Sequence, residues 1–137
     1  MNWEYVSGFF DADGCITLSR YRKNHPVKTV HVSFDNTKRE ILEVIRDFIL
    51  HETGHRAVIS TKKPRGENHS IAYALHYSHL NKCEDIIKNI SSYHPIKSRK
   101  INHVLLHMRK LTPRNGKYTE SLLQERLQFE NDFFNFQ

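Results

Sequence analysis

The segment from Trp3 to Cys15, WEYVSGFFDADGC, sets the interpretation of the rest of the chain. Its apolar residues Trp3, Val6 and Phe10 recur at helical spacing, so they predict a helix with one apolar stripe. Glycine commonly ends a helix in the left-handed conformation, and we therefore expect this helix to stop at Gly14. The residues that follow alternate between apolar and polar, which predicts that a strand begins directly after the helix.

Two further features of this helix bear on function. Glu4, Gly8 and Ala12 share a face separate from the apolar stripe, and two small residues four apart allow another backbone to come close. Asp11 and Asp13 fall in the last turn, where the partial negative charge of a helix end makes carboxylates unfavourable. Carboxylates at an unfavourable position suggest a bound cation, although an isolated Asp-x-Asp-Gly also fits an ordinary acidic turn.

Residues 6–14, VSGFFDADG, resemble the nine-residue signature of the LAGLIDADG homing endonucleases. Gly8 and the block from Asp11 to Gly14 match, and the other positions are apolar or small where the signature is apolar or small. The resemblance implies an α+β fold with an αββαββα core and a C-terminal helical extension. It also implies a nuclease that cuts double-stranded DNA at a specific site with Mg²⁺ or Mn²⁺.

The composition predicts one folded domain with an anionic partner. The chain has 137 residues, of which 38% are hydrophobic, enough for a substantial core. Its 21 Lys and Arg against 15 Asp and Glu give a net charge of +6, which favours a polyanion. We expect a single domain over residues 1–137, with a core over about 1–95 and C-terminal helices over about 96–137.

The expected location is intracellular, in the cytoplasm of a microbe or of a phage-infected cell, or in an organelle. No stretch is apolar for long enough to cross a membrane, and the N-terminus lacks a secretory signal. Cys15 and Cys83 are too few for a disulfide framework, so we expect two reduced thiols. No membrane partner is expected.

A hairpin and a helix are predicted after the first helix. Residues 15–22 and 27–35 alternate and should pair with one apolar and one polar face. Asn36 or Thr37 should cap the next helix, and Glu40 would complete a capping box with Thr37. The buried stripe of that helix is expected to include Val44.

A second hairpin and helix are predicted next. Residues 70–78 alternate with Ile71 pointing inward, while residues 56–62 pair with them and have an ambiguous facing. Residues 80–91 then form a short helix, which completes the core order implied by the resemblance. Two more helices follow, the last over 119–137.

The candidate catalytic residues surround the end of the first helix. Hydrolysis of a phosphodiester needs a water activated by metal, and Mg²⁺ prefers hard oxygen ligands. Asp13 and the carbonyl of Ala12 are such donors, and the resemblance makes Asp13 the metal ligand. It also implies that Lys97 lies beside the active site and that Lys38 helps to organise water, although both also fit the common case of solvated surface lysines.

The candidate DNA-binding residues lie on the polar faces and turns of the two hairpins. Hydroxyl, amide and imidazole groups suit base edges in a major groove, whereas lysine and arginine suit phosphates. The predicted set is Thr17, Ser19, Tyr21, Lys23, Lys28, Thr29, His31, Ser33, Lys62, Lys63, Arg65, Ser70 and His76.

The resemblance implies a homodimer, because members of the family with a single signature motif dimerise through the signature helix. The predicted interface comprises Glu4, Gly8, Asp11 and Ala12, packed against their own twofold copies on a long pseudo-palindromic DNA site. Two alternatives keep the fold without DNA cleavage. They are an intron maturase that binds RNA and a DNA-binding regulator. A third alternative is a basic interaction domain in which the Asp-Ala-Asp-Gly sequence has no catalytic meaning.

Overall fold

The computed structural model describes residues 1–64, 66–68 and 70–137, and the order of its elements agrees with the predicted core. A helix, two strands, a helix, two strands and a helix come first, and four helical segments follow. The bounds are α1 Trp3–Asp13, β1 Gly14–Arg20, β2 Lys28–Asn36, α2 Arg39–Thr53, β3 Ile59–Lys62, β4 Ala72–Ser78, α3 Leu80–Ile87, α4 Pro95–His103, η1 Val104–Met108, η2 Arg109–Leu111 and α5 Glu120–Phe134.

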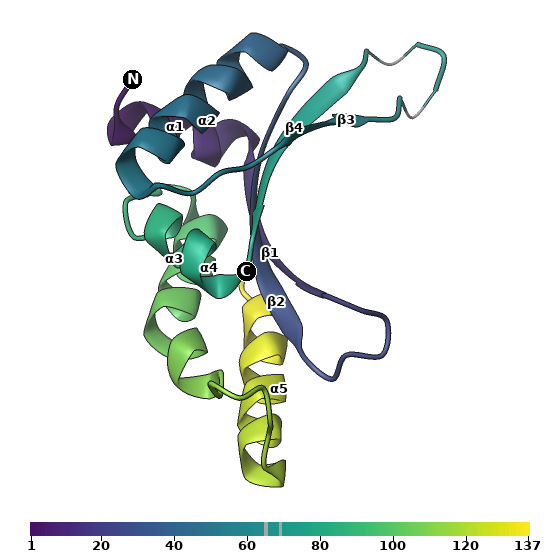
Figure 1. Cartoon of the computed structure of the whole chain (residues 1–137), viewed down its shortest axis with the longest axis vertical. Helices are drawn as coiled ribbons and strands as arrows, with labels where there is room; N and C mark the ends of the chain where they lie inside the picture. Colours follow the sequence, from purple (N-terminus) through teal and green to yellow (C-terminus); the bar gives the residue numbers. More distant parts are fainter. Residues whose placement is uncertain (65, 69) are drawn as a thin grey trace.

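The four strands form one antiparallel sheet in the order β1-β2-β4-β3. β1 and β2 pair as a hairpin from Gly14 opposite Phe34 to Arg20 opposite Lys28. β4 joins the free edge of β2, so the short strand β3 lies at the outside. Both hairpins extend beyond the helices on the same side of the molecule (Figure 1).

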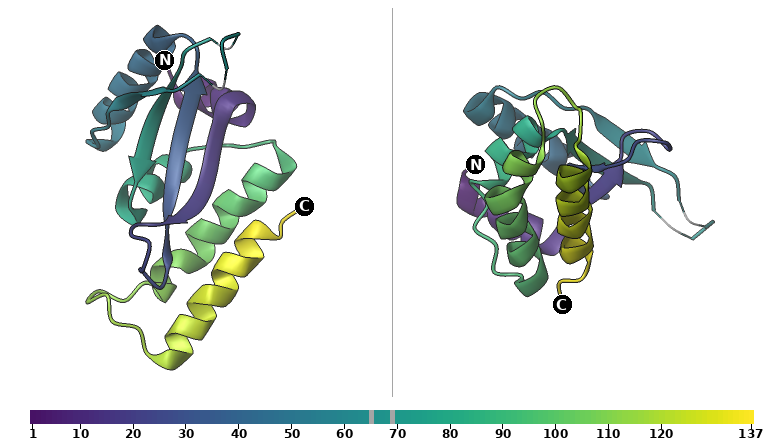
Figure 2. Two further views of the ribbon diagram at one scale, coloured as in Figure 1. Left: turned by 90° about the vertical axis from the view of Figure 1, so that its right-hand side faces the viewer. Right: turned by 90° about the horizontal axis from the view of Figure 1, so that it is seen from below.

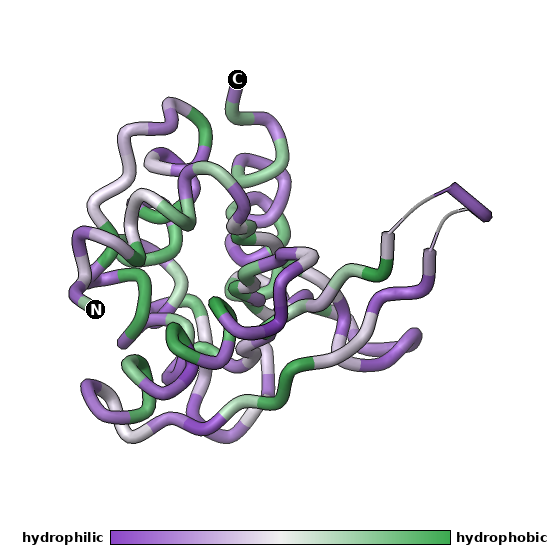
Figure 3. Tube along the Cα trace, turned by 90° about the horizontal axis from the view of Figure 1, so that it is seen from above, coloured by the Kyte–Doolittle hydropathy of each residue, from purple (hydrophilic) through white to green (hydrophobic). Residues whose placement is uncertain are grey.

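One face of the sheet is apolar and packs against helices. Ile16 and Leu18 of β1 are buried, as predicted, and so are the alternate residues of β2. The helices α1 to α4 lie on this side of the sheet (Figure 1). Apolar stretches gather among the strands and helices, whereas residues 66–68 at the end of the second hairpin are hydrophilic (Figure 3). The strand alternation therefore predicted which face would be free for a partner.

The C-terminal helices form a separate pair beside the sheet. α4 continues through η1 and η2, and α5 returns alongside them (Figure 2). Phe129 and Phe133 of α5 are buried in the common core. Within the described residues, no helix is both long enough and apolar enough to cross a membrane.

The prediction that Gly14 ends α1 in the left-handed conformation is wrong. Its backbone is extended, with φ −97° and ψ 166°, and it opens β1 directly. The glycine is required by contact instead: a Cβ placed on Gly14 would lie 2.7 Å from the Cα and the carbonyl oxygen of Phe10. The chain thus passes from helix to strand with no loop residue, which fixes Asp13 at the junction.

The predicted capping box of α2 is also wrong. The N-cap residue is Lys38, which makes no side-chain capping bond. The Asn36 side chain instead accepts a hydrogen bond from the Lys38 N–H at 2.8 Å, because asparagine readily closes a turn onto the backbone two residues later. This local turn shifts the start of the helix past Thr37.

Some apolar residues do not lie where their spacing predicted. Val44 of α2 is 47% exposed, and Ile71 precedes β4 and is 51% exposed. The ambiguous first strand of the second hairpin is short and begins at Ile59, which is buried, whereas Val58 is exposed. The exposure of Val58 follows from the edge position of β3, because no strand among the described residues lies beyond it to extend the buried face.

Candidate active site and nucleic-acid interface

The candidate active site is the C-terminal end of α1. Asp13 is the last residue of this helix and is exposed, as is Ala12. Because β1 begins at the next residue, the Asp13 carboxylate stands where the helical layer meets the sheet. Carboxylate and carbonyl oxygens at such a place are suitable ligands for a hard divalent cation.

Lys97 lies at the same helix end. α4 carries it, and its Nζ donates hydrogen bonds of 3.0 Å to the carbonyl oxygens of both Phe10 and Asp11. A cation at a C-terminal helix end interacts favourably with the partial negative charge there. Lys97 therefore lies at the helix end that carries Asp13, although 84 residues separate the two in the sequence, and its role in an active site stays a prediction. Lys97 also offsets the electrostatic cost that the two aspartates impose on α1.

Lys38 lies near the same end of the sheet but makes no side-chain bond within the described residues. It is exposed and precedes α2, two residues after β2 ends at Asn36. Phe34 of β2 pairs with Gly14, so Lys38 follows the strand end that lies beside the α1–β1 junction. Within the described residues, Lys38 therefore lies at this end of the sheet without a side-chain hydrogen bond or ion pair, and its water-organising role stays a prediction.

Asp11 has a different role from Asp13. Its carboxylate accepts a hydrogen bond of 2.5 Å from the Ser92 hydroxyl and one of 2.7 Å from the Tyr93 N–H. One turn earlier, the buried Ser7 accepts a bond of 2.9 Å from the Ser91 N–H. Two side chains of α1 therefore hold the segment that leads into α4, and through it Lys97. Sequence reasoning missed Ser7, because a small residue in an apolar signature gives no sign of a distant partner.

The metal-binding set in one chain is incomplete. Among the described residues, no group of three or more His, Cys, Asp or Glu side chains lies close enough to hold a metal ion. Asp13 and the Ala12 carbonyl provide two oxygen donors. Mg²⁺ usually takes only one or two protein carboxylates and completes its shell with phosphate oxygens and water. The donor set therefore fits a cation bound jointly with a phosphate backbone.

The free face of the sheet is polar and continuous. Thr17 pairs with His31, and Ser33 pairs with His76, so these side chains share the face opposite the core. Ser19 pairs with Thr29 farther along the hairpin. All six of these residues are predicted DNA contacts. Lys28 is also a predicted contact, but as the strand neighbour of Thr29 it points to the opposite face. The predicted residues of this face are thus brought together by strand register: Thr17, Ser19, Thr29, His31, Ser33 and His76.

Two histidines on this face, His31 and His76, contact each other through a hydrogen bond and through their rings. The Nδ1 atom of His31 lies 3.1 Å from the Nε2 atom of His76, and the rings stack with centroids 5.0 Å apart. A hydrogen bond at this distance needs one nitrogen with a proton and one without. Burial, followed by the neighbouring charge of His76, lowers the pKa of His31. The lowered pKa favours the neutral form of the His31 imidazole.

The predicted phosphate contacts are more dispersed. Lys62 makes an ion pair of 2.5 Å with Asp35, so part of its charge is already neutralised. Lys28 lies on the helical side, where its Nζ is 4.6 Å from the centre of the Phe134 ring. Tyr21 and Lys23 are exposed in the first hairpin turn. Lys63 and Ser70 are exposed near the second turn, whereas Arg65 lies outside the described residues.

The predicted interface residues of α1 form an open surface. Glu4, Gly8 and Ala12 are exposed, and a Cβ placed on Gly8 would meet no atom within 4 Å. Asp11, which was predicted to belong to this surface, is half-buried by its contacts with the segment before α4. The surface that a second copy could approach therefore centres on Gly8.

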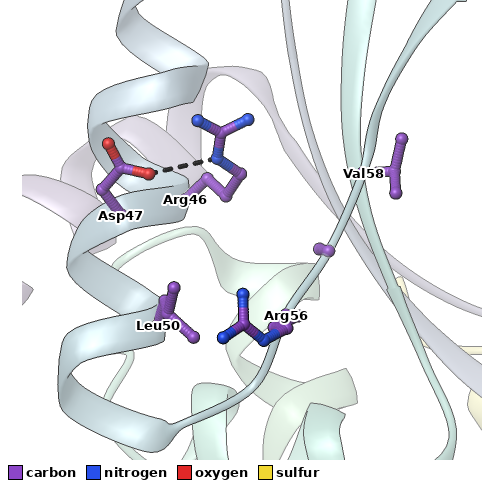
Figure 4. Close-up of a pocket in the computed structure, with 6 residues that line it drawn as sticks. Arg46, Asp47, Leu50, Arg56 and Val58 are labelled. Carbon is purple, nitrogen blue, oxygen red and sulfur yellow. Dashed lines mark hydrogen bonds and ion pairs between the residues drawn. The ribbon is translucent and has the colours of Figure 1, made fainter.

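A hollow of ≈ 450 Å³ lies away from the predicted residues, between α2 and the segment before β3. Arg46, Leu50, Arg56 and Val58 line it, and the Arg46 Nε donates to Asp47 at 3.1 Å (Figure 4). It contains no candidate catalytic side chain. The candidate active site is an exposed edge and not a closed cavity.

Comparison with known structures identifies the fold. The homing endonuclease I-CvuI, crystallised with its target and calcium, superposes with a TM-score of 0.73 at 18% identity, covering 98% of this chain and 81% of that one. The archaeal intron-encoded homing endonuclease I-Vdi141I, in complex with DNA, gives a TM-score of 0.70 at 17% identity over 98% and 83% of the chains. No curated protein sequence matches the chain.

The family assignment rests on the sequence pattern as well. The model of the LAGLIDADG endonuclease family matches residues 6–108, which run from the α1 motif through the end of η1. This range includes the αββαββα core and Lys97. Because the match covers most of the chain and agrees with the architecture, the protein belongs to the LAGLIDADG endonuclease family.

Proposed function

We propose that this protein is a homodimeric, Mg²⁺-dependent endonuclease that cuts double-stranded DNA at a specific site. The observation that carries the proposal is the placement of Asp13 and Lys97 at one helix end, where the polar face of the sheet begins. A duplex lying along that face would bring its backbone to this edge. The proposal also draws on the I-CvuI and I-Vdi141I structures, in which homing endonucleases are bound to a target and to DNA.

Asp13 and the Ala12 carbonyl would hold the metal. A bound Mg²⁺ supplies a more acidic water and neutralises charge on the scissile phosphate. Hydrolysis would add a water to phosphorus and break one P–O bond, which would leave a phosphate monoester on one strand end and a hydroxyl on the other. The exposed position of Asp13 lets the carboxylate reach a ligand outside the protein.

Lys97 would stabilise charge on the reacting phosphate. A lysine ammonium has three N–H groups, and two of them are directed to the carbonyls of Phe10 and Asp11. The third can donate to a phosphate oxygen without loss of the other two bonds. The carbonyls therefore fix the ammonium beside Asp13 in advance, which is how preorganised charge favours a transition state.

The polar face would read the DNA sequence. The side chains on this face offer hydroxyl and imidazole groups, which can hydrogen-bond to base edges in the major groove. Exposed lysines in the hairpin turns, such as Lys23 and Lys63, would contact phosphates and set the register of the duplex. A twofold pair of such faces would recognise a long pseudo-palindromic site.

The experiment is incubation with a randomised duplex library, first with Mg²⁺ and then with Ca²⁺. We expect selective cleavage with Mg²⁺ and binding without cleavage with Ca²⁺. The Asp13→Asn variant should not cleave and should bind the selected duplex as the wild type does, because the base contacts lie on the sheet. Asp47→Asn on α2 is the matched control and should cleave normally.

Each of the other outcomes would support a different function for this protein. A wild-type chain that binds a selected duplex but does not cut it with any divalent ion would be a regulator. Preference for a folded RNA over every duplex would indicate a maturase. Normal cleavage by Asp13→Asn would refute the catalytic assignment.

A further inference from the structure

A buried ion pair in α5 holds the first residue of β2. Arg126 and Glu130 are only 2% and 5% exposed, and they lie one helical turn apart with Nε and Oε2 separated by 3.4 Å. Glu130 Oε2 accepts a hydrogen bond of 3.1 Å from the Lys28 N–H. An Nη2 atom of Arg126 donates to the Lys28 carbonyl oxygen at 2.6 Å. Both backbone groups of one strand residue are therefore bound by the two members of the pair.

The side chain of Lys28 is bound by the same helix. Its Nζ lies 4.6 Å from the centre of the Phe134 ring, one turn beyond Glu130 in α5. Arg126 also donates to the Thr112 hydroxyl at 2.7 Å, which ties the loop before α5 to the same cluster. Lys28 thus has its N–H, its carbonyl and its ammonium held by α5. We refer to Arg126, Glu130 and Phe134 as the α5 clamp.

The clamp acts at the far end of the hairpin from the active site. β1 starts beside Asp13 and runs away from it, so Ser19 lies about 17 Å from Gly14 along the strand. Ser19 pairs with Thr29, and Thr29 follows the clamped Lys28 directly. Successive strand residues point to opposite faces, so holding Lys28 from the helical side fixes Thr29 on the polar face.

Stability alone does not account for a pair of this kind. Apolar residues of similar size often replace a buried ion pair with no loss of stability, because taking two charges out of water is costly. What apolar residues cannot reproduce is the pair of directed bonds to one backbone position. The clamp therefore has a geometric effect on β2 that an apolar substitute lacks.

We propose that the α5 clamp sets the position of the outer part of the β1–β2 hairpin and so determines how strictly the outer base pairs of each half-site are read. Arg126, Glu130 and Phe134 are positioning residues, and Ser19 and Thr29 make the base contacts. The proposal rests on the proposed function, because it concerns the same DNA face. Ser33 and His76, which lie nearer Asp13, are paired with each other in the ladder and do not depend on the clamp.

The test compares duplexes that carry single base-pair changes, using the target that the wild type selects, in Ca²⁺ so that only binding is measured. A change at a well-read position should weaken wild-type binding on the order of 10-fold to 100-fold. The double variant Arg126→Met with Glu130→Leu should lose most of this discrimination at the outer positions and keep it at the central ones. A general structural defect would instead weaken all positions together.

Two further variants separate the roles within the clamp. Glu130→Gln keeps a side-chain oxygen for the Lys28 N–H, so it should retain more outer discrimination than the double variant. Gln128→Met with Asp132→Leu is the matched control, because these residues form an exposed pair at the same spacing on the same helix. The control should keep the wild-type profile at every position.

The outcomes are distinguishable. If the wild type selects no duplex, the proposed function fails. If the wild type selects a duplex and the folded double variant keeps the full outer discrimination, the clamp proposal is overturned. If the double variant does not fold by circular dichroism, Arg126→Lys decides, because it keeps the charge opposite Glu130 and removes the guanidinium that donates to the Lys28 carbonyl oxygen. Unchanged outer discrimination in Arg126→Lys would then overturn the proposal.

Discussion

At the scale of single residues, the junction between α1 and β1 depends on the absence of a side chain at Gly14. The φ angle is negative, so the backbone itself would accept another residue. The obstacle is Phe10, whose Cα and carbonyl oxygen lie too close for a Cβ on Gly14. The same carbonyl accepts a bond from Lys97. Crowding at this position would therefore disturb both the end of the helix and the candidate catalytic ammonium.

Gly14→Ala should lower the free energy of unfolding by about 1–3 kcal/mol, because the methyl group overpacks a rigid backbone contact. It should also reduce cleavage strongly, since Asp13 is the adjacent residue. Urea denaturation and a cleavage assay measure the two effects. Cys15→Ala is the control at the next, exposed position and should change stability by less than about 0.5 kcal/mol. Equal stability of the two variants would show that the contact with Phe10 is not restrictive.

At the scale of elements, α1 and α4 are joined through the segment before α4. Asp11 accepts two hydrogen bonds from this segment, and Lys97 returns two bonds to the end of α1. Because the partners are more than 80 residues apart, these contacts fix how the two helices lie relative to each other. Of the two aspartates in the motif, Asp11 therefore supports the structure, whereas Asp13 is exposed to solvent.

Asp11→Ala should lower the free energy of unfolding by about 1.5–3 kcal/mol, since it removes the acceptor of two bonds to a charged group. Asp13→Ala is the matched variant two residues away and should leave stability unchanged or slightly higher, because a carboxylate is unfavourable at a helix end. Chemical denaturation of both variants gives the comparison. A larger loss in Asp13→Ala than in Asp11→Ala would contradict this division of roles.

Local patterns predicted the elements, whereas their ends and distant contacts could not be predicted. Alternation identified the buried faces of β1 and β2 because burial repeats every second residue. Alternation failed at Ile71, and helical spacing failed at Val44, because both apolar side chains are about half exposed. The motif predicted Asp13 as a metal ligand, and its resemblance to a family predicted Lys97 beside the active site; both roles stay predictions. No sequence signal indicated that Arg126 would bind Lys28, since the partners are 98 residues apart and meet only in the folded chain.

At the scale of the whole molecule, the exposed face of α1 is the proposed contact with a second copy. Gly8 lies at its centre with open space above it. A twofold contact there would place two Asp13 side chains near one axis, and a shared duplex would then meet two cutting sites. One chain alone offers one Asp13 site, so cleavage of both DNA strands would depend on the dimer.

Gly8→Leu should fold as a monomer or a weakened dimer and should no longer make double-strand breaks, because the side chain would separate the two helices. Analytical sedimentation gives the assembly state, and a supercoiled plasmid distinguishes nicked from linear product. Val44→Leu on α2 is the control for adding bulk at an exposed position. A wild-type protein that sediments as a monomer while linearising the plasmid would refute the dimer.

The two cysteines lie in opposite environments, and this difference has a chemical consequence. Cys83 is buried, donates from Sγ to the carbonyls of Val30 and Tyr77 at 3.5 Å, and has its pKa raised by burial to about 12. Cys15 is exposed and follows Gly14 at the start of β1. Alkylating reagents attack thiolates, so they will modify one position and spare the other. The unaltered protein therefore carries its own attachment point for a fluorophore or spin label, two residues from the proposed metal ligand.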